Sequence, residues 1–291
     1  MSDDDDRSRA AAFRERTTGA DVELPYAGFN TFLKAEPATV EEAGQADAAV
    51  LGAPYDGAVS NRPGARYGPS EVREASAWWA YLSGYKGGLT NMRTRSQVDY
   101  SKLSLVDCGD VPVFPMDHEK TADAIEAHVG TVAAQGTMPV LIGGDHYCTA
   151  PSFQGFADGA GQDNVGFVQI DAHTDTVAES PIFGTDFHGS STARIADLPK
   201  ADYDSVSQVG IRGYESAEYF EFAEDSGIDL YTMRDVEERG IISVVQDAVE
   251  SAARDTDAVY VTFDIDGVDP GFAPGTGTPI PGGLTPRQAL A

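Results

Sequence analysis

Short apolar runs alternate with longer amphipathic stretches over most of the chain. The apolar runs predict strands within 48–54, 103–111, 138–146, 164–176, 204–213, 227–233 and 257–266. Helical periodicity predicts helices at 68–82 and at 120–136, the second of which ends at Gly136. Strands that alternate with helices form βαβ units. The pattern therefore predicts an α/β fold with three αβα layers, in which helices cover both faces of a mostly parallel sheet.

The first 24 residues do not share this pattern. They are polar and charged and include the acidic run SDDDDRSR. With few apolar side chains to bury, residues 1–24 are expected to form an acidic mobile arm. Residues 25–291 contain no Ser/Gly-rich linker, so we expect one domain there.

The chain is strongly acidic. Its 47 Asp and Glu residues against 20 Lys and Arg give a formal net charge of −27. This balance argues against binding to nucleic acid or to an anionic membrane by general electrostatics, and it favours a cationic partner. Because the acids are spread along the whole sequence, we also expect a halophilic protein suited to high salt, where screening is strong.

The two cysteines, Cys108 and Cys148, lie in apolar contexts and are interpreted as reduced core thiols. The N-terminus is acidic where a signal peptide would be basic, and no apolar run approaches the roughly 20 residues of a membrane span. These features predict a cytoplasmic location.

The run 257–266 ends in two carboxylates. Because side chains of a strand alternate between its faces, Asp264 and Asp266 would share one face with Tyr260 and Thr262. Two unpaired carboxylates on a buried face repel each other and lose hydration, so cations must neutralise them or their pKa values must rise. For either acid alone, a strand end that emerges into water is a sufficient explanation.

Two further predicted strands also end in ligand-type residues, and function in such sheets collects at the carboxyl ends of the strands. The combined set holds four carboxylates and two imidazoles: His146, Asp171, His173, Asp175, Asp264 and Asp266. An oxygen-rich set without thiolate suits manganese or magnesium. Two divalent ions would balance the four acids and activate water for hydrolysis. Each residue alone has a structural explanation, but their coincidence at three strand ends favours a binuclear site.

Other polar residues have simpler interpretations. His118 and His128 lie near or on a predicted surface helix, which favours a solvated role. His188 lies in a Gly/Ser-rich loop, where a proton shuttle or a substrate contact is an option. Arg62 and Arg66 belong to a Pro/Gly-rich loop, for which structural arginines are favoured over an anion site.

These motifs together resemble the ureohydrolases, the family of arginase, agmatinase, guanidinobutyrase and formiminoglutamase. The matching segments are GGDH (143–146), DAHTDT (171–176), FHGSS (187–191) and FDIDGVDPGFAPGTGTPIPGGL (263–284), with further likeness in 52–76 and 106–111. The resemblance covers about residues 26–290. It implies an arginase-like fold, two Mn²⁺ ions per chain and a homo-oligomer, either a trimer or a hexamer.

The resemblance also implies a role for each residue. One ion would be held by His146, Asp171, Asp175 and Asp264, and the other by Asp171, His173, Asp264 and Asp266, so that Asp171 and Asp264 bridge. A hydroxide between the ions would attack the guanidinium carbon of the substrate. Asp175 would pass its proton to the leaving amine, and His188 would shuttle protons or contact the substrate. Urea and an amine would leave.

Within the family, the motifs look most like agmatinases, which predicts agmatine as the substrate and a place in polyamine metabolism. Guanidinobutyrate, guanidinopropionate, arginine and formiminoglutamate stay open as alternatives, because Tyr147, Cys148 and the loop around His188 depart from common family patterns. The family would continue beyond the position of Ala291 with a strand and a closing helix. We therefore expect a truncated member, for which an inactive metal-binding homologue is a further alternative.

Overall fold

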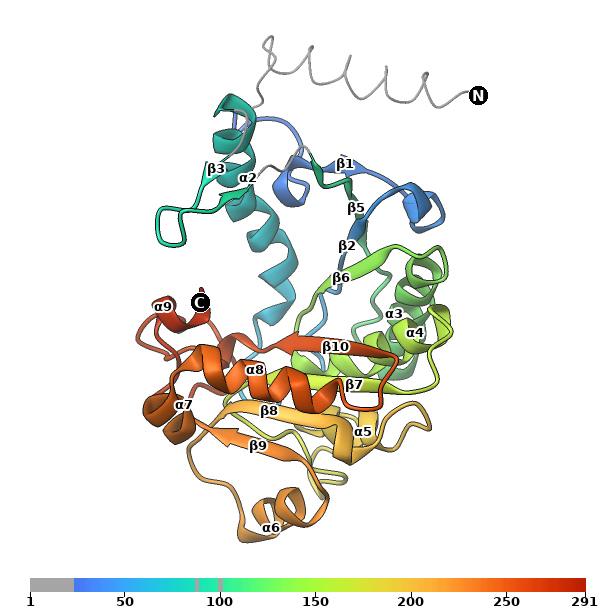
Figure 1. The fold of residues 1–291 in the computed structure, drawn as a ribbon. Helices are drawn as coiled ribbons and strands as arrows, with labels where there is room; N and C mark the ends of the chain where they lie inside the picture. Colours follow the sequence, from blue (N-terminus) through green and yellow to red (C-terminus); the bar gives the residue numbers. More distant parts are fainter. Residues whose placement is uncertain (1–23, 87–88, 99–101) are drawn as a thin grey trace.

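The computed structural model describes residues 24–86, 89–98 and 102–291 (Figure 1). The predicted N-terminal arm, apart from its last residue Leu24, lies outside these ranges. Among the described residues, no helix combines the length and the apolar character that a membrane span needs.

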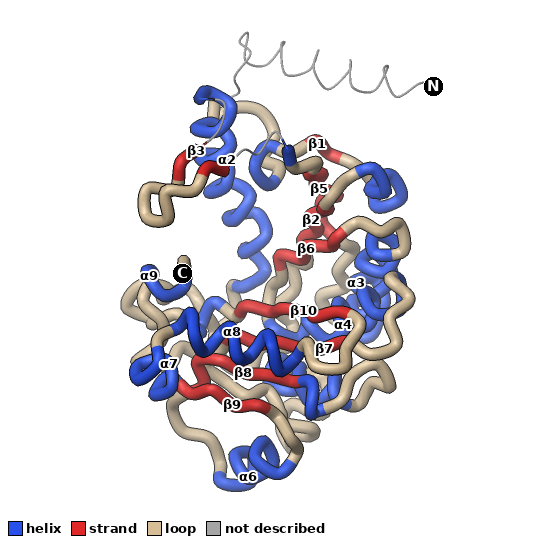
Figure 2. Tube along the Cα trace, viewed as in Figure 1, coloured by secondary structure: helices blue, strands red, loops and turns tan. Residues whose placement is uncertain are grey.

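Eight strands form two parallel sheets of four, which Figure 2 shows as separate groups. In the N-terminal sheet the order is β1 (Glu36–Pro37), β5 (Leu105–Asp110), β2 (Ala48–Gly52) and β6 (Met138–Ile142). In the C-terminal sheet the order is β10 (Ala258–Phe263), β7 (Val165–Ile170), β8 (Val206–Ile211) and β9 (Asp229–Thr232). All pairs within the two sheets are parallel. A short antiparallel pair, β3 (Leu89–Thr90) with β4 (Gln97–Val98), lies apart from both.

The helices mostly connect these strands. The α-helices are α2 (Gly68–Lys86), α3 (His118–Ala133), α4 (Thr149–Gly159), α5 (Ser191–Ala196), α6 (Ala217–Asp225), α7 (Met233–Arg239), α8 (Ile241–Ala252) and α9 (Pro286–Ala289). Short 3₁₀ turns are η1 (Phe32–Lys34), η2 (Val40–Gln45), η3 (Ala65–Tyr67), η5 (His146–Cys148), η6 (His188–Ser190), η7 (Tyr203–Ser205) and η8 (Ile265–Gly267). Each strand and helix expected from the periodicity is present, and the α/β prediction is confirmed.

Side-chain alternation along β7 explains the layering of the C-terminal sheet. Val168 faces a cluster that includes Ala248 of α8, whereas Phe167 belongs to a cluster with Phe153 of α4 and Ile195 of α5. Successive residues of this strand therefore bury themselves against helices on opposite faces, as expected for a parallel strand covered on both sides.

Helix α3 covers one face of the N-terminal sheet and packs against α4. Two glycines of α4 permit this close approach. A Cβ atom on Gly155 would come within 2.4 Å of the Glu126 carbonyl oxygen, and one on Gly159 within 2.3 Å of the Gly130 carbonyl oxygen. Only a residue without a side chain fits at either position.

A buried arginine joins α2 to β5. Arg73 Nε donates to Asp107 Oδ2 at 2.9 Å, and its Nη2 donates to Asp107 Oδ1 at 3.0 Å and to the Gly109 carbonyl at 2.9 Å. Its Nη1 donates to Asp110 Oδ1 at 2.5 Å. Arg73 and Asp107 are 7% and 2% exposed, so neither charge has water to replace its partner. The planar guanidinium suits this forked arrangement, which a lysine could not reproduce.

Replacing Arg73 should destabilise the fold strongly. Arg73→Met keeps much of the side-chain volume but leaves the Asp107 carboxylate buried without a cation, which costs about 3–5 kcal/mol. Urea unfolding at a fixed salt concentration measures the difference. The control is Arg234→Met, since Arg234 forms an exposed pair with Glu238 and should contribute little. Equal stability of the two variants would contradict the role given to Arg73.

Candidate metal centre

The six ligand-type residues predicted from the sequence lie just beyond the carboxyl ends of three strands. His146 opens η5 after β6, and Asp171 follows β7 directly, with His173 and Asp175 in the same loop. Asp264 and Asp266 follow β10, whose last residue is Phe263. The expectation that both acids lie on the strand is wrong in this detail. Asp264 caps the turn η8 by accepting a hydrogen bond from the Asp266 backbone N–H at 2.9 Å.

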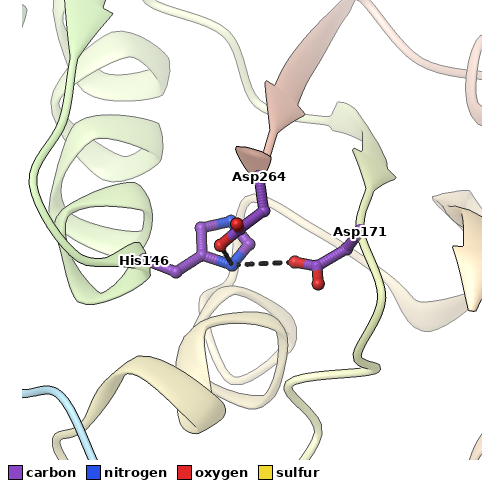
Figure 3. A group of neighbouring side chains, drawn as sticks. All are labelled: His146, Asp171 and Asp264. Atoms are coloured by element: carbon purple, nitrogen blue, oxygen red, sulfur yellow. Dashed lines mark ion pairs between the residues drawn. The ribbon is translucent and has the colours of Figure 1, made fainter. Parts of the chain in front are cut away.

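The side chains nevertheless converge, and Figure 3 shows this for His146, Asp171 and Asp264. Nδ1 of His146 lies 2.6 Å from Asp175 Oδ2, 3.1 Å from Asp171 Oδ2 and 3.6 Å from Asp264 Oδ2. The drawn residues come from the ends of three different strands, and their nitrogen and oxygen atoms point at one another.

A second cluster adjoins the first. Nδ1 of His173 lies 3.2 Å from Asp266 Oδ2 and 3.5 Å from Asp171 Oδ1. Ligand atoms of His146, Asp171 and Asp264 lie within 4.8 Å of one another, and so do those of Asp171, His173 and Asp266. Asp171 belongs to both groups and turns one oxygen toward each histidine.

Burial makes this concentration of acid costly. Asp171 and Asp266 are almost fully buried, and Asp175 is 8% exposed. Burial and the neighbouring acids Asp171 and Asp266 raise the pKa of Asp264 well above its usual value. Burial and Asp171 raise the pKa of Asp175 to about 6. These carboxyls can all be ionised only if positive charge enters the cluster.

The two histidines of the cluster are one source of positive charge. Burial lowers the pKa of His146, but hydrogen bonds to Asp171 and Asp175 outweigh burial and hold it well above the usual value. Hydrogen bonds to Asp171 and Asp266 likewise outweigh the effect of burial and raise the pKa of His173 to about 11. Although burial raises the pKa of the Asp171 carboxyl, hydrogen bonds from the two histidines hold it below its usual range.

The residues fit a pair of divalent cations. Two overlapping groups, each with one imidazole and two carboxylates, share the central acid Asp171. Oxygen donors predominate and no thiolate takes part, which suits manganese or magnesium better than a structural zinc.

His188 lies in η6, outside both groups. Its Nε2 accepts the backbone N–H of Ser60 at 3.0 Å and lies 2.6 Å from the Ser60 hydroxyl oxygen. Burial and the positive charges on His146 and His173 lower its pKa to about 4. The ring is therefore neutral near pH 7 and carries its proton on Nδ1, because a backbone N–H can only donate to Nε2.

The predictions for two other histidines and two arginines can be followed in the structure. His118 is exposed, although its Nδ1 also lies 2.5 Å from the Tyr55 hydroxyl oxygen, and His128 bonds the carbonyl of its own helix. Arg66 pairs with the buried Asp56, as expected for a structural arginine. Arg62 Nε donates to the Gly277 carbonyl oxygen at 3.5 Å. None of these residues joins a ligand group.

Two of the expected departures from family patterns, Tyr147 and Cys148, lie in the core. Tyr147 and Cys148 are both buried and pack in one cluster with Tyr55 and Phe187. Cys148 is a free thiol, and Cys108 is free and only partly buried.

Two supporting residues were missed from the sequence. Arg212 follows β8 and donates to the backbone carbonyls of Asp266 at 2.6 Å, Gly267 at 3.2 Å and Ile280 at 2.7 Å. It thereby ties the loop that carries Asp266 to the sheet. Gln169 lies in the interior of β7 and donates to Asp171 Oδ2 at 2.8 Å. A polar side chain in the middle of the apolar run VGFVQI was the available signal.

Comparison with known proteins gives consistent relatives. A family model described as "Arginase family" matches residues 46–291. The mitochondrial agmatinase of Gallus gallus is 34% identical over 245 residues, which cover 84% of this chain and 68% of that protein. The guanidinopropionase of Pseudomonas aeruginosa is 35% identical over 273 residues, which cover 92% of this chain and 80% of that protein.

The solved structures agree with the sequence matches. The proclavaminate amidino hydrolase from Streptomyces clavuligerus superposes with a TM-score of 0.76 at 31% identity, and the match covers 92% of this chain and 84% of that one. The arginase from Bacillus subtilis superposes with a TM-score of 0.67 at 26% identity over 83% of this chain and 82% of that one.

Removing one central acid should abolish tight binding of the metal pair. Asp264→Asn keeps the size of the side chain but removes one negative charge next to His146 and Asp171, so we expect a large loss of Mn²⁺ affinity. Equilibrium dialysis with metal analysis measures the bound ions per chain. Asp257→Asn, at an exposed acid seven residues earlier in the chain, is the matched control. If the two variants bind alike, the cluster is not a metal centre.

Proposed function

Because the chain belongs to the arginase family, we propose that it hydrolyses a guanidino compound to urea and an amine, with agmatine as the favoured substrate. The observation that carries this proposal is the pair of His–Asp groups that share Asp171. A buried centre of this kind, reached from three strand ends, suits hydrolysis assisted by two metal ions.

We propose the ligand set that the family resemblance implies. His146, Asp171, Asp175 and Asp264 would hold one Mn²⁺, and Asp171, His173, Asp264 and Asp266 the other. When bound, two such ions would neutralise the acids and lower the pKa of a water molecule toward neutrality, which supplies the nucleophile. In support, Asp175 lies closest to His146, and Asp171 turns one oxygen to each histidine.

Two residues of the chain are proposed to handle protons. The Asp175 carboxylate lies inside the cluster, 2.6 Å from His146 Nδ1, where it is placed to take a proton and pass it to a leaving amine. His188 is neutral and fixed by Ser60 through Nε2, which leaves its Nδ1–H as a donor toward the substrate or a water.

The substrate class follows from the shared chemistry of the relatives. Agmatinase and guanidinopropionase are both named after guanidino compounds. The two compounds share the guanidinium group and differ in the rest of the molecule. A cationic substrate such as agmatine is also attracted by the acidic chain, with its formal charge of −27. Guanidinobutyrate, guanidinopropionate and arginine are the alternatives with the same product, and formiminoglutamate would give formamide.

We also propose a cellular location for the enzyme. The two cysteines are free, which is compatible with a reducing compartment and supports a cytoplasmic location. A homo-oligomer and a requirement for high salt stay predictions from the resemblance and the composition.

The proposed reaction predicts urea as a product. Purified protein loaded with Mn²⁺ should release urea from agmatine faster than from guanidinobutyrate, guanidinopropionate or arginine, at low and at high salt. Protein stripped with EDTA should be inactive and should recover when Mn²⁺ is returned. Formamide from formiminoglutamate would reassign the substrate. Two bound metal ions without turnover of any of the five compounds would identify an inactive homologue.

A further inference from the structure

Two glutamines face each other inside the C-terminal sheet. Gln169 of β7 is paired in register with Gln208 of β8, and neither side chain is exposed. Strands buried on both faces normally carry Val, Ile or Leu at such positions, and a buried amide without partners costs about 1–3 kcal/mol. These two residues therefore need a compensating role.

The amide of Gln169 uses its whole hydrogen-bonding capacity. Its Nε2 donates to Asp171 Oδ2 at 2.8 Å and to the His173 carbonyl oxygen at 3.2 Å. Its Oε1 accepts the Thr192 hydroxyl at 2.6 Å and the Gln208 amide at 2.7 Å. The reverse orientation would set the amide oxygen against a carboxylate and a carbonyl, so the surrounding donors and acceptors determine one orientation.

The network reaches the whole loop that follows β7. Gln208 Nε2 also donates to the Thr174 carbonyl oxygen at 2.5 Å, and the backbone N–H of Thr192 donates to the Asp175 carbonyl oxygen at 3.0 Å. Asp175 needs this support because its φ is 51°, a left-handed conformation that non-glycine residues rarely adopt. The side chain of Thr192 contacts Gln169 and Gln208 but makes no hydrogen bond to a proposed metal ligand.

We propose that Gln169 is a positioning residue that, with Gln208 and Thr192, fixes the Asp171 carboxylate and so sets the affinity of the centre for its metal ions. This inference rests on the proposed metal pair and adds residues that act on it through Asp171. When a residue that orients a metal-ligating side chain by hydrogen bonding is removed, the metal affinity typically falls about 10- to 100-fold.

The test measures Mn²⁺ binding to the folded protein by isothermal titration, together with the thermal midpoint of the metal-free protein. Gln169→Met should weaken Mn²⁺ binding about 10- to 100-fold. Thr192→Val, which removes only the hydroxyl that orients the Gln169 amide, should weaken it several-fold. The double variant should bind as Gln169→Met does, because both changes act through the same amide.

Ser207→Ala is the matched control. Ser207 precedes Gln208 on β8, is fully buried, and its hydroxyl has no hydrogen-bond partner in the described part of the chain. Its removal should leave Mn²⁺ affinity at the wild-type value.

The outcomes separate this inference from the proposed function. A folded Gln169→Met variant with wild-type Mn²⁺ affinity and only a lower thermal midpoint would show a structural role and overturn the inference. If that variant does not fold, Thr192→Val decides: a several-fold loss of affinity supports positioning, and an unchanged affinity overturns it. Wild-type protein that binds no Mn²⁺ would overturn the proposed function, and this inference with it.

Discussion

The mutual repulsion of buried carboxylates is the constraint on which the rest of the site depends. Asp171, Asp175, Asp264 and Asp266 meet in a space from which water is largely excluded, and burial penalises the negative charge of each. The repulsion shows in the raised pKa of the Asp264 carboxyl, and contacts with the carboxylates in turn raise the pKa of His146. A fold that keeps such a cluster together needs positive charge close to these acids.

Much of this centre could be predicted from the sequence, because its positions follow from strand periodicity. The ends of β6, β7 and β10 were visible as apolar runs that change to polar residues, and parallel strands bring their carboxyl ends to one side. The detail that failed is local. Asp264 begins a turn and caps it, since its carboxylate accepts the Asp266 N–H, and alternation along a strand cannot anticipate that bond.

The supporting residues and the pairing of the strands could not be predicted in the same way. Arg212 acts through backbone carbonyls of 266, 267 and 280, which are distant from it in the sequence, and Gln169 meets Thr192 only after α5 has packed. The division into two sheets has the same origin. The apolar run 138–142 predicts a strand, but tertiary packing determines which strand it pairs with. Among the described residues, β6 and β10 each pair with a single neighbour.

The proposed metal ligands follow strands of both sheets. His146 follows a strand of the N-terminal sheet, whereas the other five residues follow strands of the C-terminal sheet. Hydrogen bonds already join the two sides here, because Ser191 donates to the His146 carbonyl and Ser60 donates to His188. A cation held by His146 together with Asp171 and Asp264 would therefore link both sheets, and binding to the folded state alone would stabilise that state by mass action. If the proposed ions bind, the carboxylates whose burial costs free energy would also hold the two sheets together.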